Sequence, residues 1–423
     1  MPENRSPIIV SKFGGSSVGD AECIRNVTQI VDSTRAEGRL IVVVSALGGM
    51  TDDLVNAIDG AITRSRQPSE DVAALVDRYE KVAAVLLSGD AQAELYTFVN
   101  HFWAELGELL DGIYLLRECT PRTRDAVISI GELVTAPLVT AVLAEAGIAA
   151  APVDARQLIR TDADFGEANV DMEVTYQVVK DYFTSVADDV VAVVTGFVAT
   201  TADGVTATLG RSGSDYTATL LGGALQATRV DIWTDVDGVL SADPRIVKDA
   251  FTIDALSYAE AGELAYFGAK VLHPRTMRPL LAHSIPLHIK NSFNPGAAGT
   301  VITPEGKPSG GRVKAITSVR GVAVVMIEGT GMAGVPGVSA RAFSALAGDG
   351  INVLMISQAS SEQSICIVVM AARAEAAVHS LIGAFDVELT RQDISRIYSI
   401  RDCAILSAVG DRMRHKPGLA GRM

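Results

Sequence analysis

Residues 8–18 read IIVSKFGGSSV, a run of β-forming residues followed by two glycines and two serines. Lys12 stands one position before the last residue of that run, Phe13. Glycines let backbone N–H groups approach an anion closely, and a lysine adds a positive charge beside them. The stretch predicts a strand that ends in an anion-binding turn; an ordinary tight turn with an exposed lysine is the alternative. It is not a Walker A loop, because G-x-x-x-x-G-K-[ST] is absent.

Strand-like and helix-like stretches alternate over roughly the first 300 residues. Strands are expected at residues 7–13, 39–47, 149–155, 189–200 and 229–236, and helices at 69–87, 131–147 and 214–227. Several of these strands are apolar throughout, which is typical of a sheet that is covered on both faces. The alternation predicts an α/β fold with a mostly parallel sheet sandwiched by helices. Ligand sites of such sheets lie at the carboxyl ends of the strands.

The composition changes at residues 294–312, which are rich in glycine and proline and predict a linker. An internal repeat follows, in which the segment from Val322 aligns with the segment from Cys403. The first copy continues into a β-α-β-β-α-β pattern, which predicts a ferredoxin-like α+β domain. The expected division is 1–300 for the α/β domain, 301–320 for a linker and leading strand, 321–397 for the α+β domain, and 398–423 for the start of a second, truncated copy.

Composition and charge narrow the class of protein. A chain of 423 residues with 48% hydrophobic and 20% charged residues predicts a globular protein of two or three domains. The net charge of −14 argues against nucleic-acid and anionic-membrane partners. We expect no membrane-spanning segment, no secretory signal and a cytoplasmic location. The four cysteines lie far apart, which predicts reduced thiols and no metal site.

A second glycine-rich motif, TLGRSGSDYTATLLGGAL, covers residues 208–225. Arg211 lies between two glycines, and Ser214 and Asp215 open a helix-like stretch. Helix capping by Ser or Asp is the ordinary explanation, but capping does not require glycines on both sides of an arginine. A helix N-terminus beside an arginine suits an anionic group, so the motif favours a second anion site.

Three further motifs place charged residues near the ends of predicted elements. They are residues 129–133 with Glu132, 231–245 with Asp235 and Arg245, and 266–275 with Lys270. Each has an ordinary alternative: a glutamate that complements a helix dipole, a turn, or a solvated lysine. Apart from His273, which we interpret as structural, histidine is missing from these motifs. A carboxylate acceptor is already ionised at pH 7, with a pKa of about 4, and needs no base. The charged residues and glycine turns of these motifs therefore favour phosphoryl transfer to a carboxylate, assisted by fixed positive charge and Mg²⁺.

With these motifs in hand, the chain resembles the aspartate kinases of the amino acid kinase family. The matching motifs, in family order, are SKFGGSSV, VVVSALGGMTDDL, SIGEL, VTGFV, LGRSGSDYTA, WTDVDGVLSADPR and FGAKVLHP. The C-terminal part resembles ACT domains, and DVDG and VLHPRT resemble the threonine-sensitive type. The resemblance implies transfer of the ATP γ-phosphoryl group to the β-carboxylate of L-aspartate, the first step of lysine, threonine and methionine biosynthesis. The alternatives are another carboxylate kinase of the family and a catalytically silent amino-acid sensor.

The resemblance also implies roles for individual residues. The ATP site would comprise Lys12, Gly14, Gly15, Ser16, Thr234, Asp235, Leu240, Arg245 and Lys270, with Leu240 in place of a common tyrosine. The aspartate site would comprise Ser45, Thr51, Glu132, Phe197, Arg211 and Ser214. The catalytic residues would be Lys12, Arg211, Asp215 and Lys270, and Asp215 would contact the Mg²⁺ of Mg·ATP indirectly. A threonine or lysine effector would bind near Asn352, Gln358 and Ser360. A homodimer or higher homo-oligomer is expected.

Overall fold

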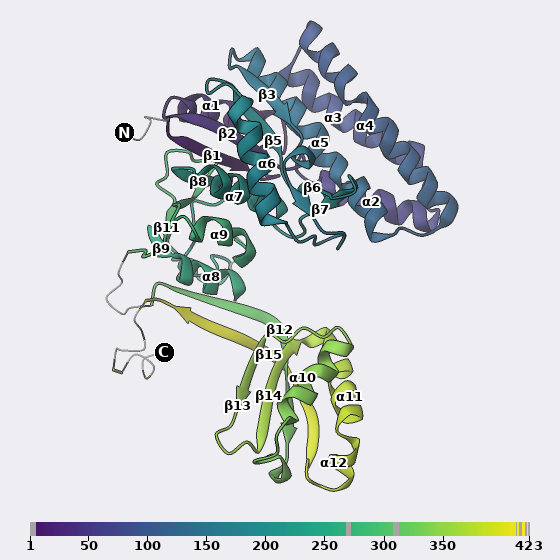
Figure 1. The fold of residues 1–423 in the computed structure, drawn as a ribbon, viewed down its shortest axis with the longest axis vertical. Helices are drawn as coiled ribbons and strands as arrows, with labels where there is room; N and C mark the ends of the chain where they lie inside the picture. The colour runs from purple at the N-terminus through teal and green to yellow at the C-terminus, as the bar shows by residue number, and fades with distance from the viewer. Residues whose placement is uncertain are drawn as a thin grey trace. The chain divides into compact units, whose positions relative to one another are not determined.

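The computed structural model describes residues 6–267, 272–307, 313–411, 413, 417–418 and 421. By its internal contacts the chain divides into two compact units (Figure 1). The first comprises Met1–Lys314 and Gly410–Met423, and the second comprises Ala315–Val409.

The first unit is built on an eight-stranded sheet. In spatial order its strands are β3 (Ala150–Val153), β5 (Val191–Thr195), β2 (Arg39–Val44), β1 (Ile8–Phe13), β8 (Arg229–Thr234), β10 (Leu287–Asn291), β11 (Thr300–Thr303) and β9 (Ala255–Ser257). Every neighbouring pair is parallel except β10 and β11, so the predicted mostly parallel sheet is confirmed. Because β2, β1 and β8 are parallel neighbours, their carboxyl ends meet at one edge of the sheet.

Helices cover both faces of this sheet. They are α1 (Ala21–Arg35), α2 (Met50–Thr63), α3 (Pro68–Leu86), α4 (Gly89–Leu116), α5 (Pro121–Glu145), α6 (Met172–Ser185), α7 (Gly213–Leu225), α8 (Tyr258–Tyr266) and α9 (Pro274–Leu281). Leu40, Val42 and Val44 of β2 pack into the core formed with α1 to α5. On the opposite face, Gly222 of α7 lies directly against the side chain of Val230 in β8. This double cover explains why the strands are apolar throughout.

Helix α5 is longer and more central than the sequence predicts. The expected start was residue 131, but the helix begins at Pro121, where the side chain of the N-cap residue Thr120 accepts a hydrogen bond from the backbone N–H of Thr123 (3.2 Å). By length and composition alone, α5 is the helix among the described residues that could cross a membrane. In the structure 89% of its apolar window is buried, as in the core helix of a globular domain.

The predicted strand at residues 189–200 is two strands in different sheets. The chain leaves β5 at Thr195, and β6 (Val198–Thr201) joins a small sheet with β4 (Arg160–Thr161) and β7 (Thr206–Thr208). The break falls at Gly196 and at Phe197, whose φ is +69°. A continuous apolar pattern cannot reveal such a break, because it records burial and not the path of the backbone.

The second unit has the predicted β-α-β-β-α-β order. Its main elements are β12 (Ala315–Glu328), α10 (Val338–Gly348), β13 (Met355–Gln358), β14 (Ser364–Met370), α11 (Ala374–Ala384), α12 (Asp386–Thr390) and β15 (Arg396–Val409). They form an antiparallel sheet in the order β13-β14-β12-β15. The ferredoxin-like α+β fold class is therefore confirmed for this unit.

The structure divides the C-terminal part differently from the sequence. The expected linker at residues 294–312 contains β11, a strand of the large sheet, so that interpretation was wrong for Thr300–Thr303. Val322 and Cys403, the first residues of the two repeat copies, are register partners in one sheet. The expected boundary at 397/398 falls inside β15. Most of the end of the second copy, residues 412, 414–416, 419–420 and 422–423, lies outside the described residues.

Candidate active site at the carboxyl edge of the sheet

Lys12 and Asp215 form an ion pair at the carboxyl edge of the sheet. Side chains alternate along β1, so Lys12 faces α7 while Phe13 stacks on Trp233 at the opposite face (ring centroids 6.0 Å apart). Asp215 lies in the first turn of α7. The Lys12 Nζ atom is 2.5 Å from Asp215 Oδ1, and the two side chains are only 12% and 10% exposed. The predicted strand and helix motifs thus meet through their charged residues.

The glycine turn after β1 is tied to the neighbouring strand. The backbone N–H of Gly14 donates to the carbonyl of Trp233 (3.3 Å). The buried hydroxyl of Ser17 contacts the same carbonyl (3.3 Å) and the hydroxyl of Ser292 (2.8 Å). We therefore expect the turn to keep its shape when an anion binds. Sequence reasoning treated Ser17 only as one of two hydroxyls; its anchoring role depends on Ser292, 275 residues away.

A second glycine turn, after β2, packs against the first. A Cβ atom placed on Gly48 would lie 2.9 Å from the carbonyl oxygen of Gly15 and 3.0 Å from the Cα of Gly19. Real Cβ atoms essentially never come that close to backbone, so the two turns can touch only because residue 48 is glycine.

Glu132 is a buried carboxyl group at the same edge. It is 2% exposed, and its Oε2 atom has no hydrogen-bond partner among the described residues. Burial raises the pKa of Glu132 to about 8, although hydrogen bonds from Ala46 and Ser45 and the charge of Lys12 act in the opposite direction. At neutral pH the carboxyl group is therefore mostly protonated when no ligand is bound.

Two serine hydroxyls connect Glu132 with the start of α7. Ser214 Oγ donates to Ser45 Oγ (3.4 Å), and Ser45 Oγ donates to Glu132 Oε1 (3.5 Å). Both distances exceed the usual O–H···O range of about 2.5–3.0 Å, so these two contacts are weak hydrogen bonds. This row of side chains, Ser214, Ser45 and Glu132, joins α7, the end of β2 and α5. All three are predicted substrate residues.

Close backbone packing supports this row. A Cβ atom on Gly196 would lie 2.5 Å from Ser214 Cβ, and one on Gly213 would lie 2.5 Å from the ring of Phe197. The positive φ of Phe197 is supported by a hydrogen bond from its backbone N–H to Thr217 Oγ1 (3.1 Å). Backbone strain that is held in place by its surroundings is common at functional sites.

Arg211 lies on the loop between β7 and α7, and its side chain is exposed. Within the described part of the chain, no carboxylate forms an ion pair with it. The nearby His273 caps α9, because its Nδ1 atom accepts a hydrogen bond from the backbone N–H of Arg275 (3.3 Å). Burial lowers the pKa of His273, and the charges of Arg211 and Arg275 lower it further. The structural interpretation of His273 agrees with this capping.

The remaining predicted residues are less closely connected. Thr234 is the last residue of β8, and its hydroxyl donates a hydrogen bond of 3.0 Å to the carboxylate of the next residue, Asp235. Arg245 is exposed and pairs with Asp243 (2.7 Å). The other positions are Ser16, which is exposed, Leu240 and Thr51, which are half-buried, and Asn352, Gln358 and Ser360, which are exposed in the second unit. Lys270 lies outside the described residues.

One buried carboxylate near the site was missed by the sequence analysis. Asp125 is fully buried in α5 and accepts hydrogen bonds from Thr208 and Gly166, on both sides of the loop that carries Arg211. The available signal was its position seven residues before Glu132, with a largely apolar stretch between the two acids. At 3.6 residues per turn, that spacing places both acids on one face.

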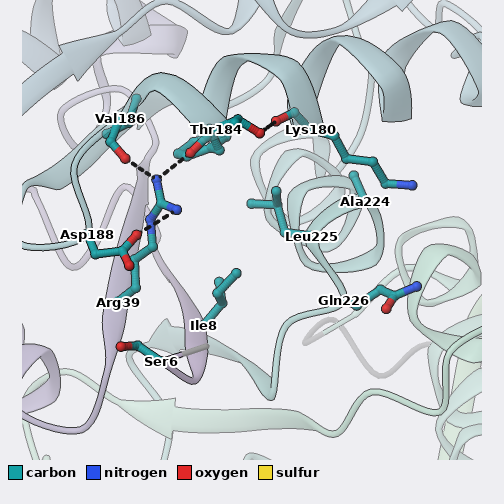
Figure 2. A pocket seen from close by; sticks show the side chains of 11 residues that line it. Ser6, Ile8, Arg39, Lys180, Thr184, Val186, Asp188, Ala224, Leu225 and Gln226 are labelled. Atoms are coloured by element: carbon teal, nitrogen blue, oxygen red, sulfur yellow. Dashed lines mark hydrogen bonds and ion pairs between the residues drawn. The ribbon is translucent and has the colours of Figure 1, made fainter. Parts of the chain in front are cut away.

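Two cavities lie away from this cluster of residues. One, of about 510 Å³, opens at the amino ends of β1 and β2 (Figure 2). There Arg39 donates to the carbonyl groups of Phe183 and Val186 and pairs with Asp188 (2.9 Å), so it joins the end of α6 to the sheet. The other, of about 410 Å³, lies between α4 and α5. The candidate active site is identified by its charges and glycine turns and not by cavity size.

Comparison with known proteins places this fold and site in a known class. The model of the amino acid kinase family matches residues 7–291, and an ACT-domain model matches residues 325–385. The chain belongs to the amino acid kinase family.

Aspartokinases are among its relatives within that family. The bifunctional aspartokinase/homoserine dehydrogenase 2 of Arabidopsis thaliana is 37% identical over 97% of this chain and 45% of the relative. The chain thus spans about half the length of that protein. Escherichia coli aspartokinase III in complex with aspartate and ADP superposes with a TM-score of 0.81, at 29% identity over 98% of this chain and 90% of that one. Its complex with lysine and aspartate gives 0.76, at 31% identity over 95% and 87%.

Proposed function

We propose that this chain is an ATP-dependent aspartate kinase, which transfers the γ-phosphoryl group of ATP to the β-carboxylate of L-aspartate and forms 4-phospho-L-aspartate. The observation that carries the proposal is the Lys12–Asp215 pair at the carboxyl edge of the sheet, beside two glycine turns and a helix N-terminus. The likeness to a solved aspartokinase that holds aspartate and ADP supports the same chemistry.

The main difficulty of this reaction is repulsion between two anions. Lys12 supplies a fixed positive charge, and the N–H groups of Gly14 and Gly15 and the first turn of α7 supply further donors. Asp215 holds the Lys12 ammonium group in one position. Arg211 binds the acceptor through a carboxylate, because its guanidinium group can form two parallel hydrogen bonds. No side-chain base is needed, since the acceptor is already ionised.

Glu132 suits the ammonium group of the amino-acid substrate. Its Oε2 atom lacks a partner, and burial disfavours its charged form. A bound ammonium group supplies the missing partner and favours the ionised carboxylate. Ser45, Ser214, Thr51 and Phe197 complete the proposed aspartate site.

The Mg²⁺ ion of the proposed reaction binds together with ATP, as Mg·ATP. Among the described residues, no group of three or more His, Cys, Asp and Glu side chains could hold a metal. Mg²⁺ commonly binds through substrate phosphates, waters and one or two carboxylates, and this donor set fits Mg·ATP with Asp215 as an indirect contact. The rest of the proposed ATP site comprises Ser16, Thr234, Asp235, Leu240, Arg245 and Lys270.

A hydroxamate assay tests the proposal. The chain is incubated with Mg·ATP, hydroxylamine and aspartate, and any acyl phosphate is trapped as a coloured hydroxamate. Signal with aspartate but not with glutamate supports an aspartate kinase. Signal with glutamate alone would favour another carboxylate kinase, and absence of signal with both would favour the amino-acid sensor. Lys12→Ala is the control for contaminating kinases.

We propose that the second unit binds a regulatory amino acid, threonine or lysine, near Asn352, Gln358 and Ser360. The E. coli enzyme solved with lysine and aspartate supports this class of ligand. Activity measured against increasing threonine and increasing lysine distinguishes the two effectors. A homodimer or higher homo-oligomer, and a cytoplasmic location, belong to the same proposal.

A further inference from the structure

Asp125 accepts three hydrogen bonds although its carboxylate is completely buried. The donors are the backbone N–H of Thr208 (2.8 Å), the hydroxyl of Thr208 (2.9 Å) and the backbone N–H of Gly166 (2.9 Å). All three groups donate to it, so the acceptor-only carboxylate form satisfies them completely. Hydrogen bonds to a charged acceptor are the stronger kind, and leaving their donors without a partner in the interior is costly.

These bonds hold both sides of the loop that carries Arg211. Thr208 is the last residue of β7, three positions before the arginine. Gly166 belongs to a loop that packs against Gly210, since a Cβ atom on Gly210 would lie 3.0 Å from the Gly166 carbonyl oxygen. The two segments are also joined by a hydrogen bond from the Ala168 N–H to the Thr208 carbonyl (3.1 Å). Asp125 therefore holds in place the two segments that contact the Arg211 loop, the end of β7 and the loop of Gly166.

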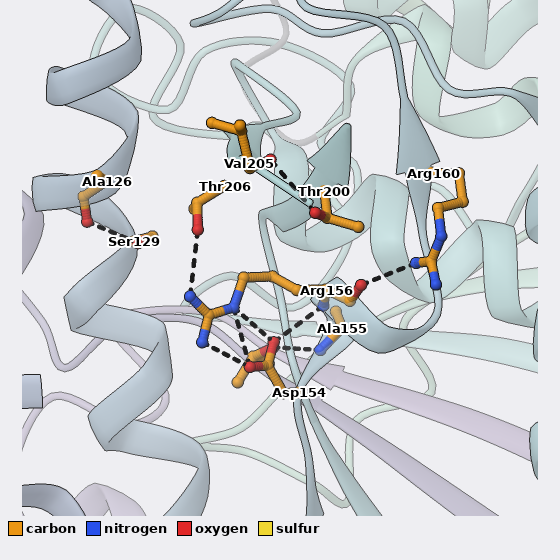
Figure 3. Close-up of polar contacts among 10 residues, drawn as sticks. Ala126, Ser129, Asp154, Ala155, Arg156, Arg160, Thr200, Val205 and Thr206 are labelled. Atoms are coloured by element: carbon orange, nitrogen blue, oxygen red, sulfur yellow. Dashed lines mark hydrogen bonds and ion pairs between the residues drawn. The ribbon is translucent and has the colours of Figure 1, made fainter. Parts of the chain in front are cut away.

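The other end of β7 has an anchor of its own. Arg156 donates to Thr206 Oγ1 (3.1 Å) and forms an ion pair with Asp154 (2.7 Å), as Figure 3 shows. The side chains of Arg156 and Asp154 are about one quarter exposed. They hold the first residue of β7, whereas Arg211 follows the last residue of that strand. This second anchor provides a matched comparison, because it holds the same three-residue strand without touching the Arg211 loop.

We propose that Asp125 is a positioning residue for the substrate-binding arginine: its buried carboxylate holds the end of β7 and the Gly166 loop so that Arg211 faces a carboxylate of the amino-acid substrate. This inference rests on the proposed function. Asp125 and Glu132 belong to one helix, so α5 carries both the support of the arginine loop and the carboxyl group proposed for the substrate ammonium.

Asp125→Asn tests the role with little change in volume. The amide oxygen can accept from both backbone N–H groups in the place of Oδ2, but the NH₂ group then faces the Thr208 hydroxyl. That hydroxyl loses its acceptor, and the two N–H groups lose their stronger bonds to a charged oxygen. We expect the KM for aspartate to rise on the order of tenfold or more, and the KM for ATP to change by less than about twofold. Thr208→Val removes only the hydroxyl bond and should raise the aspartate KM by a smaller factor. Thr206→Val, at the opposite anchor, should leave it within about twofold.

Amide hydrogen exchange of residues 209–212 gives a readout that does not depend on activity. Faster exchange in Asp125→Asn, with unchanged exchange in Thr206→Val, supports the positioning role. An unchanged aspartate KM in Asp125→Asn overturns it, whatever happens to stability. If Asp125→Asn fails to fold, Thr208→Val decides, and an unchanged aspartate KM there overturns the role. Failure of the proposed function is separate, because the unsubstituted chain would then give no hydroxamate with aspartate.

Discussion

Glu132→Gln tests the buried carboxyl group at the centre of the proposed substrate site. Glutamine has nearly the same shape but carries no titrating proton. In the folded protein burial raises the pKa of Glu132 from 4.5 to about 8. The folded state therefore binds this proton more tightly than the unfolded chain does. Between these two pKa values the unfolded chain has lost the proton and the folded protein keeps it, so stability falls as pH rises.

The size of the effect follows from the two pKa values. Proton linkage for a single group predicts that the free energy of unfolding loses about 3.5 kcal/mol between pH 5 and pH 8 because of Glu132. Glu132→Gln lacks this contribution. The unfolding free energy of the unsubstituted chain minus that of the variant should therefore decrease by about 3 to 4 kcal/mol between pH 5 and pH 8. The stability of the variant relative to the unsubstituted chain thus rises with pH.

Tryptophan fluorescence makes the measurement specific to the first unit. The two tryptophans of the chain, Trp103 and Trp233, both lie in that unit and are buried in its core. Urea unfolding followed by their emission at pH 5, 6, 7 and 8 gives the free energies for both proteins. Other titrating groups affect both proteins equally, so the difference isolates position 132. A difference that stays constant with pH would refute the shifted pKa.

The same reasoning predicts how aspartate binding depends on pH. If the substrate ammonium needs the ionised form of Glu132, the KM for aspartate should fall by up to about tenfold per unit as pH rises from 6 towards 8. Glu132→Gln should show a higher KM without this slope. A pH-independent KM in the unsubstituted chain would contradict the assignment of Glu132 to the ammonium group.

Three further substitutions test the rest of the site. Lys12→Ala should lower kcat on the order of 100-fold or more, because it removes a charge that stabilises the transition state; an unchanged kcat would exclude Lys12 from the mechanism. Arg211→Lys should chiefly raise the KM for aspartate, because lysine cannot form two parallel hydrogen bonds, and an unaltered KM would argue against the role. Gly196→Ala should lower the unfolding free energy by about 1–3 kcal/mol and displace Ser214. Urea unfolding tests this change, with Gly107→Ala as its control, since nothing lies within 4 Å of a Cβ there.

Local sequence patterns predicted the central strands of the first unit and three of its helices. The apolar stretches at residues 7–13, 39–47 and 229–236 are β1, β2 and β8, because strands covered on both faces have little need for polar residues. The helix expected at residues 69–87 is α3, within one residue at each end. The break at Phe197 was missed, because the residues on both sides of it are equally buried.

The candidate site was predicted in its residue types but not in its arrangement. Glycine turns, Lys12 and the Asp215 motif are visible as short patterns, because their chemistry is local. The unpartnered Oε2 atom of Glu132 and the three bonds of Asp125 are not visible in that way. Each depends on residues tens of positions away, which only folding brings together.

Short segments of the sequence were enough to predict the class of fold, the glycine turns and the set of charged residues, because burial patterns and backbone freedom are properties of such segments. Folding brings Lys12 to Asp215, buries Glu132 so that its pKa rises, and places the carboxylate of Asp125 beside Thr208. Ion pairing and burial depend on distance in space. The chain sets those distances only when β1, α5 and α7 pack around a shared sheet edge.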